Sequence, residues 1–105
     1  MKHAGPTALD HLEALLRKLR AFEALKEKSR GTFYRRGKAF LHFHEHGDEL
    51  FADVRFTTEF ERIRVTRPTE QRSLLARVRA GLADGLPRGA TLKARAPSGS
   101  VADDR

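Results

Sequence analysis

Residues 38–56 read KAFLHFHEHGDELFADVRF, and this stretch decides the fold that the rest of the chain must fit. On both sides of Gly47-Asp48, apolar and polar side chains alternate, which is the period of a β-strand and not of a helix. Before this turn the inward set is odd-numbered, with Leu41 and Phe43, and after it the inward set is even-numbered. The stretch therefore predicts an antiparallel hairpin with one apolar face.

The parity of the two sets fixes the register of this hairpin. A two-residue loop at 47–48 and a four-residue loop over 46–49 both keep the apolar sets on one face, whereas a three-residue loop does not. Either loop pairs His44 with Phe51 and His42 with Asp53 on the polar face.

The segment before residue 38 predicts a preceding strand. TFYR at 32–35 leads into Arg36-Gly37, a dipeptide suited to a tight turn. The same pairing logic sets Phe33 opposite Phe40 and Arg35 opposite Lys38, with both phenylalanines on the polar face.

Beyond residue 56, FERIRVT at 60–66 predicts a further strand with Arg62 and Arg64 beside the polar face. Leucines at steps of three and four predict an amphipathic helix over 7–30 that ends at Gly31. A second helix is expected from Pro68, with its end at Gly81 or Gly85.

Together these elements predict an α+β fold: an antiparallel sheet of three or four strands, with an N-terminal and a C-terminal helix on one face. Residues 1–84 form a single domain in this interpretation. Residues 85–105 are rich in Gly, Pro, Ala and Ser and predict a disordered tail.

Composition limits the classes of function. The chain has 105 residues, no Cys and a formal net charge of +7, so thiolate chemistry is excluded and an anionic partner is favoured. No apolar run reaches the roughly 20 residues of a membrane span, which favours a cytoplasmic protein without membrane contact.

The polar face of the sheet is the first candidate site. RGKAFLHF at 36–43 matches the RNP1 pattern of RNA recognition motifs at all but its third position, where Lys38 replaces an aromatic residue. The element order does not fit that family, because a helix comes first and a strand follows the matching strand. The polar face could still bind nucleic acid or another anion outside that family, with cations on phosphates and an aromatic ring on a base. The residues of this predicted face are Arg35, Arg36, Lys38, Phe40, Arg55, Arg62 and Arg64.

Histidines in HFHEH suggest a metal site as an alternative. His42 and His44 lie about 6.6 Å apart along the strand, while His42 and His46 lie about 13 Å apart, so the three do not easily share one ion. The best set is His42 and His44 with Asp53, for Zn²⁺ or Ni²⁺, with Asp53 as a ligand or as an orienting group. A His42–Asp53 hydrogen bond on a half-exposed face explains the same residues without any metal.

No nucleophile converges on the His42–Asp53 pair, so no catalytic residue is assigned and a non-enzymatic module is favoured. A third interpretation is a homodimer that buries an aromatic cluster of Phe33, Phe40 and Phe51.

The region 32–56 also carries a family resemblance. Gly37, Lys38 and Phe40, followed by Asp48, Glu49 and Leu50, resemble the hairpin and "DELF" element of small bacterial domains of the YjbR and TfoX N-terminal type. About a quarter of the chain is covered. The resemblance implies a non-enzymatic binding module with a DNA-binding or regulatory role, and it identifies no site residue.

Overall fold

The computed structural model describes residues 1–83. The predicted tail over 85–105, and the last residue of the predicted domain over 1–84, lie outside the described residues. Along the chain the elements are β1 (Lys2–His3), α1 (Pro6–His11), α2 (Glu13–Arg20), β2 (Lys26–Ser29), β3 (Thr32–Arg35), β4 (Lys38–His46), β5 (Glu49–Val54), β6 (Glu61–Arg64) and α3 (Pro68–Ala83).

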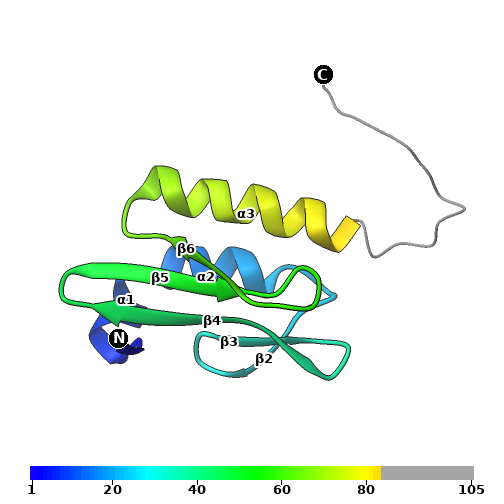
Figure 1. Ribbon diagram of the computed structural model, residues 1–105, viewed down its shortest axis with the longest axis horizontal. Coiled ribbons are helices and arrows are strands. Elements are labelled where there is room, and N and C mark those ends of the chain that lie inside the picture. The colour runs from blue at the N-terminus through cyan, green and yellow to red at the C-terminus, as the bar shows by residue number, and fades with distance from the viewer. Residues whose placement is uncertain (84–105) are drawn as a thin grey trace, which may run out of the picture.

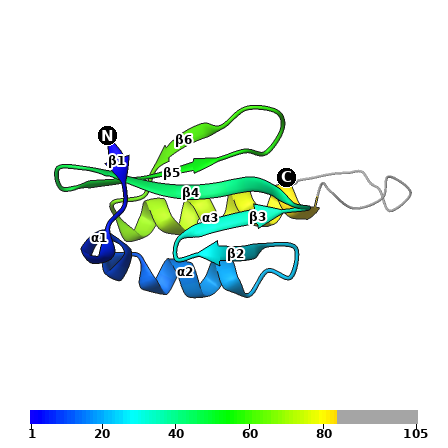
Figure 2. The same ribbon diagram turned by 90° about the horizontal axis from the view of Figure 1, so that it is seen from below.

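These elements form an α+β fold, as predicted (Figure 1). The sheet is antiparallel in the order β2-β3-β4-β5-β6, and β1 pairs with the end of β4 that β3 does not reach. With β1 and β2 the sheet has six strands, two more than the largest number expected. Helices α2 and α3 lie side by side against one side of the sheet (Figure 2).

The central hairpin has the predicted register. β4 and β5 pair continuously from Leu41 with Val54 to His46 with Glu49, which includes both predicted polar-face pairs. The loop is the two-residue one, and Gly47 adopts a φ of 62° there, which glycine tolerates without the steric cost that a side chain brings. Leu41, Phe43, Ala52 and Val54 consequently face the helices and are buried.

The expected helix over 7–30 is wrong in its second half. The helical part breaks at Leu12 and ends at Arg20, and Lys26–Ser29 form an edge strand, β2. After Leu25 this segment has no apolar residue to extend the helical stripe, so continuing the helix would bury nothing. Gly31, with a φ of 82°, serves the β2–β3 turn instead of capping a helix.

A bulge in β4 overturns the predicted pairing of Phe33 with Phe40. Phe33 is opposite Leu41 and Tyr34 is opposite Ala39, so Phe40 is the extra residue in β4. The bulge turns Phe40 toward the helices, where its ring meets that of Phe56 edge-on at 6.0 Å between centroids. Phe33 is 0% exposed and Phe40 is 3% exposed, so both belong to the core and not to the open face.

The last helix begins at Pro68, as expected, and buries Leu74, Leu75 and Val78. Gly81 lies inside it and does not end it. A Cβ atom at this position would sit 2.6 Å from Cδ1 of Phe56, so the glycine allows the β5–β6 loop to pack closely on the helix. Within residues 1–83 no helix has the length and hydropathy that a membrane crossing requires.

Burial of Phe40 leads to a stability prediction. Phe40→Ala should lower the free energy of unfolding by about 3–5 kcal/mol, the usual cost of removing a core phenylalanine. Phe60→Ala is the matched control: Phe60 is 41% exposed, and its loss should cost less than about 1 kcal/mol. Urea denaturation measures both values, and equal, small losses would contradict the bulged register.

Candidate metal centre

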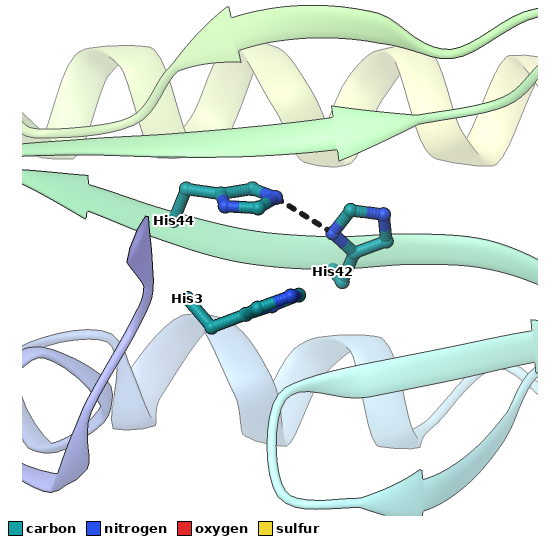
Figure 3. A group of neighbouring side chains, drawn as sticks. All are labelled: His3, His42 and His44. Atoms are coloured by element: carbon teal, nitrogen blue, oxygen red, sulfur yellow. Dashed lines mark hydrogen bonds between the residues drawn. The ribbon is translucent and has the colours of Figure 1, made fainter. Parts of the chain in front are cut away.

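The open face of the sheet carries a cluster of three histidines, His3, His42 and His44 (Figure 3). Alternation along β4 puts His42 and His44 on this face, and the pairing of β1 with β4 sets His3 directly opposite His44. Because partners in an antiparallel pair project to the same face, the side chain of His3 joins the other two.

The N-terminal segment that carries His3 is held in place by hydrogen bonds to β4. The amide of Ala4 donates to the carbonyl of Phe43 at 3.0 Å. The amide of Gly5 donates to Oε2 of Glu45 at 2.6 Å, just before α1 begins. The position of His3 is thus fixed by the hydrogen bonds of Ala4 and Gly5 as well as by the pairing of β1 with β4.

The three imidazoles are close enough to share one ion. One potential ligand atom of each lies within 4.8 Å of those of the others. Nδ1 of His42 and Nε2 of His44 are 3.0 Å apart and share a hydrogen bond. The ring of His3 stacks on that of His44 with 4.7 Å between centroids. The cluster therefore extends across two neighbouring strands and not only along β4.

Asp53 lies next to the cluster, but most of its bonding capacity is already used. Arg62 binds it with two hydrogen bonds of 2.8 Å, from Nε to Oδ1 and from the terminal nitrogen to Oδ2. Oδ2 is also 3.1 Å from Nε2 of His44. This geometry gives Asp53 the position of a carboxylate that orients a histidine, while Arg62 neutralises its charge.

The electrostatic environment favours neutral imidazole at His42. Burial lowers the pKa of His42, and the neighbouring His44 lowers it further. The hydrogen bonds from Arg62 lower the pKa of Asp53, so this carboxyl is ionised at neutral pH. Among the described residues, Nδ1 of His44 is the one buried side-chain nitrogen or oxygen atom without a hydrogen-bond partner. Neutral imidazole with a free nitrogen is the form that binds metal ions.

The loop between β5 and β6 covers one side of the cluster. The ring of Phe60 lies 5.1 Å from that of His42, between centroids, and the guanidinium of Arg55 lies 4.8 Å from the Phe60 ring centre. Arg55 also donates to the carbonyl of Ala39 at 2.5 Å. Arg55 is therefore engaged with its own protein and is not directed outward as a free cation.

The residues expected to form a nucleic-acid face are not all gathered on it. Phe40 is in the core, and Arg62 is bound to Asp53. Arg64 lies 3.4 Å from Glu49 and 3.7 Å from Glu70. Apart from Arg55, described above, the rest of the set lies at the β3–β4 turn, at the other end of β4 from His44 and His46: Arg35, Arg36 and Lys38.

The predicted metal set is close to the observed cluster. His42, His44 and Asp53 do come together, and His46 is exposed at the end of β4. Sequence reasoning missed His3, because a strand of two residues has no periodicity to detect. In the sequence, His3 stands out only as a histidine that precedes the first predicted element, the helix over 7–30.

Comparisons with protein-family models, curated proteins and solved structures find no match for this chain. The resemblance to YjbR and TfoX N-terminal domains therefore stays a prediction, and the site has to be interpreted from its own geometry.

The lowered pKa of the partly buried His42 predicts acid sensitivity of the metal-free protein. The folded chain holds the pKa of His42 below its ordinary value of 6.5, so acid protonates the unfolded chain first and favours unfolding. The free energy of unfolding, measured by urea denaturation with a chelator present, should fall from about pH 7 to pH 5. His42→Gln should flatten this profile, whereas His46→Gln should leave it steep. An unchanged profile in the His42 variant would contradict the assignment.

Proposed function

We propose that this domain binds one divalent transition-metal ion through His3, His42 and His44. The observation that supports this proposal is the approach of their ligand atoms to within 4.8 Å of one another. Imidazole is a preferred ligand of Zn²⁺, Ni²⁺ and Cu²⁺, and a three-histidine set with one open position is a common zinc arrangement.

A purely structural explanation accounts for only part of the geometry. A hydrogen bond between His42 and His44 needs no metal, and one proton shared by the two rings satisfies it. It does not account for the buried Nδ1 of His44, which has no partner, nor for a third imidazole stacked on the same ring. An ion bound at the cluster would give one lone pair of each neutral imidazole a partner, while each ring keeps its single N–H proton.

The ligand chemistry narrows the choice of ion. The chain has no Cys, so the thiolate ligands of soft ions such as Cu⁺ are missing. Zn²⁺ is the best match, because it accepts three imidazoles in a tetrahedral site without a strong geometric demand of its own. Ni²⁺ is the second ion to test.

Metal binding would also fasten the N-terminal strand to the sheet. His3 comes from β1 and the other two ligands from β4, so one ion would link residues about 40 positions apart in sequence. A ligand that binds only the folded chain stabilises it by about 2.7 kcal/mol at one hundred times its dissociation constant. The proposed role is therefore that of a binding module, and no catalytic step is assigned to it.

The first test removes the ligand that only the structure identifies. Structural zinc sites gain about 10–16 kcal/mol from four ligands, so His3→Ala should weaken zinc binding by roughly 100-fold or more. His46→Ala is the matched control, since His46 is an exposed histidine outside the cluster, on the strand that carries His42 and His44. Calorimetric titration with Zn²⁺ measures both affinities. Wild-type protein that binds no zinc, or a His3 variant that binds it equally well, would overturn the proposal.

A second test predicts an effect of opposite sign. Arg62 places a positive charge beside the cluster and occupies both carboxylate oxygens of Asp53. Arg62→Gln should tighten zinc binding by about 10-fold, because the cation that neutralises the Asp53 carboxylate beside the site is removed. Circular dichroism checks that the variant is folded, and weaker binding by the folded variant would show that Arg62 supports the site instead of opposing it.

A further inference from the structure

A cavity lies at the end of the domain that carries the β4–β5 turn. It is lined by residues of α1, of this turn and of the start of α3, three segments that lie together at this end in both views (Figures 1 and 2). Its volume of about 560 Å³ falls within the range of roughly 300–1,000 Å³ that small-molecule sites occupy. No residue of the histidine cluster lines it, so it is separate from the candidate metal centre.

The cavity carries negative charge. Glu45, near the end of β4, and Asp48, in the β4–β5 turn, both line it, whereas none of its described lining residues is Lys or Arg. Neither carboxylate forms an ion pair within residues 1–83, although the chain has a net charge of +7. Even Lys2, which is opposite Glu45 in the β1–β4 pair, does not form one. Two carboxylates of a basic protein are thus left without a cation.

Hydrogen bonds to the main chain hold polar side chains of the cavity in place. Oε2 of Glu45 accepts from the amide of Gly5 at 2.6 Å, which leaves Oε1 for a ligand. Nε2 of Gln71, another lining residue, donates to the carbonyl of Val65 at 3.1 Å, which leaves the side-chain oxygen of Gln71 as an acceptor. The cavity therefore offers acceptors in fixed positions, and these suit a ligand that donates hydrogen bonds.

The rest of the cavity does not favour an anion. Ala8 and Leu50 line it and are buried, and Pro68 adds to this apolar part. The first turn of α3 brings the positive end of a helix dipole nearby. Glu70 in that turn accepts from the amide of Arg67 at 2.9 Å and offsets this partial charge. The cavity thus combines carboxylates and other acceptors with an apolar part.

We propose that this cavity binds a small aliphatic diamine in its protonated form. Each ammonium group donates up to three hydrogen bonds and brings the charge that Glu45 and Asp48 leave unbalanced, while the methylene chain packs on the apolar part. A bare metal ion fits less well, because Glu45 and Asp48 belong to no group of three metal-ligating side chains within the described part of the chain. This proposal does not depend on the metal centre.

The test is a nuclear magnetic resonance titration of the full chain with putrescine, a four-carbon diamine, at low salt and with a chelator present. Amide signals of residues 45–48 and 66–71 should shift as putrescine binds. The butanediol of the same length has no charge and should shift them far less. Asp48→Asn should weaken putrescine binding by about 10-fold, the loss expected from one charge-assisted hydrogen bond. Circular dichroism checks that this variant is folded.

The matched control removes a carboxylate elsewhere. Glu23→Gln changes an exposed glutamate that forms no ion pair among the described residues, in the segment after α2 at the opposite end of the domain (Figure 1). This variant should keep the wild-type affinity. Equal weakening in both variants would show that net charge alone is responsible and would overturn the proposal. Wild-type affinity in the folded Asp48 variant, equal shifts with butanediol, or no shift at millimolar putrescine would also overturn it.

Discussion

The pairing of β4 with β5 across Gly47-Asp48 is the constraint on which the rest of this structure depends. A slip of one residue would move every side chain of one strand to the other face, exposing Leu41 and Phe43 and burying the histidines. The two-residue turn rules out that slip. Once this hairpin is fixed, β1 and β3 share one edge of β4, β6 takes the outer edge of β5, and the helices cover the apolar side.

This constraint explains which parts of the fold can be predicted. The parity of the apolar positions is clear on both sides of the turn, in Leu41–Phe43 and in Leu50–Val54, so it predicts the register of this hairpin and the placement of His42 beside Asp53. The bulge at Phe40 leaves no such trace, because Phe40 and Leu41 are both apolar and either can serve as the inward residue. The same ambiguity affects Gly31, whose positive φ suits a helix end and a hairpin turn equally well.

The site shows a similar division between what periodicity encodes and what it does not. His42, His44, Asp53 and Arg62 lie together because each is an outward position of a strand with a readable pattern. The position of His3 depends on contacts that exist only in the folded chain. The chief ones are the hydrogen bond from the amide of Gly5 to Glu45 and the stacking of the His3 ring on the His44 ring. Ion pairs are equally invisible in the sequence, since an arginine looks the same whether or not a carboxylate meets it.

Those ion pairs affect both kinds of ligand that the sequence predicts for the open face, a metal ion and phosphate, through one mechanism. The sequence places Arg62 and Arg64 on the histidine face, where unpaired positive charges would oppose a dication and favour phosphate. In the structure Asp53 neutralises Arg62, while Glu49 and Glu70 hold Arg64, so much of the local positive charge is cancelled. Cancelling it makes the histidine cluster more suitable for a metal ion and less suitable for phosphate. Where the protein places its carboxylates therefore decides which positions on this face keep an uncompensated positive charge.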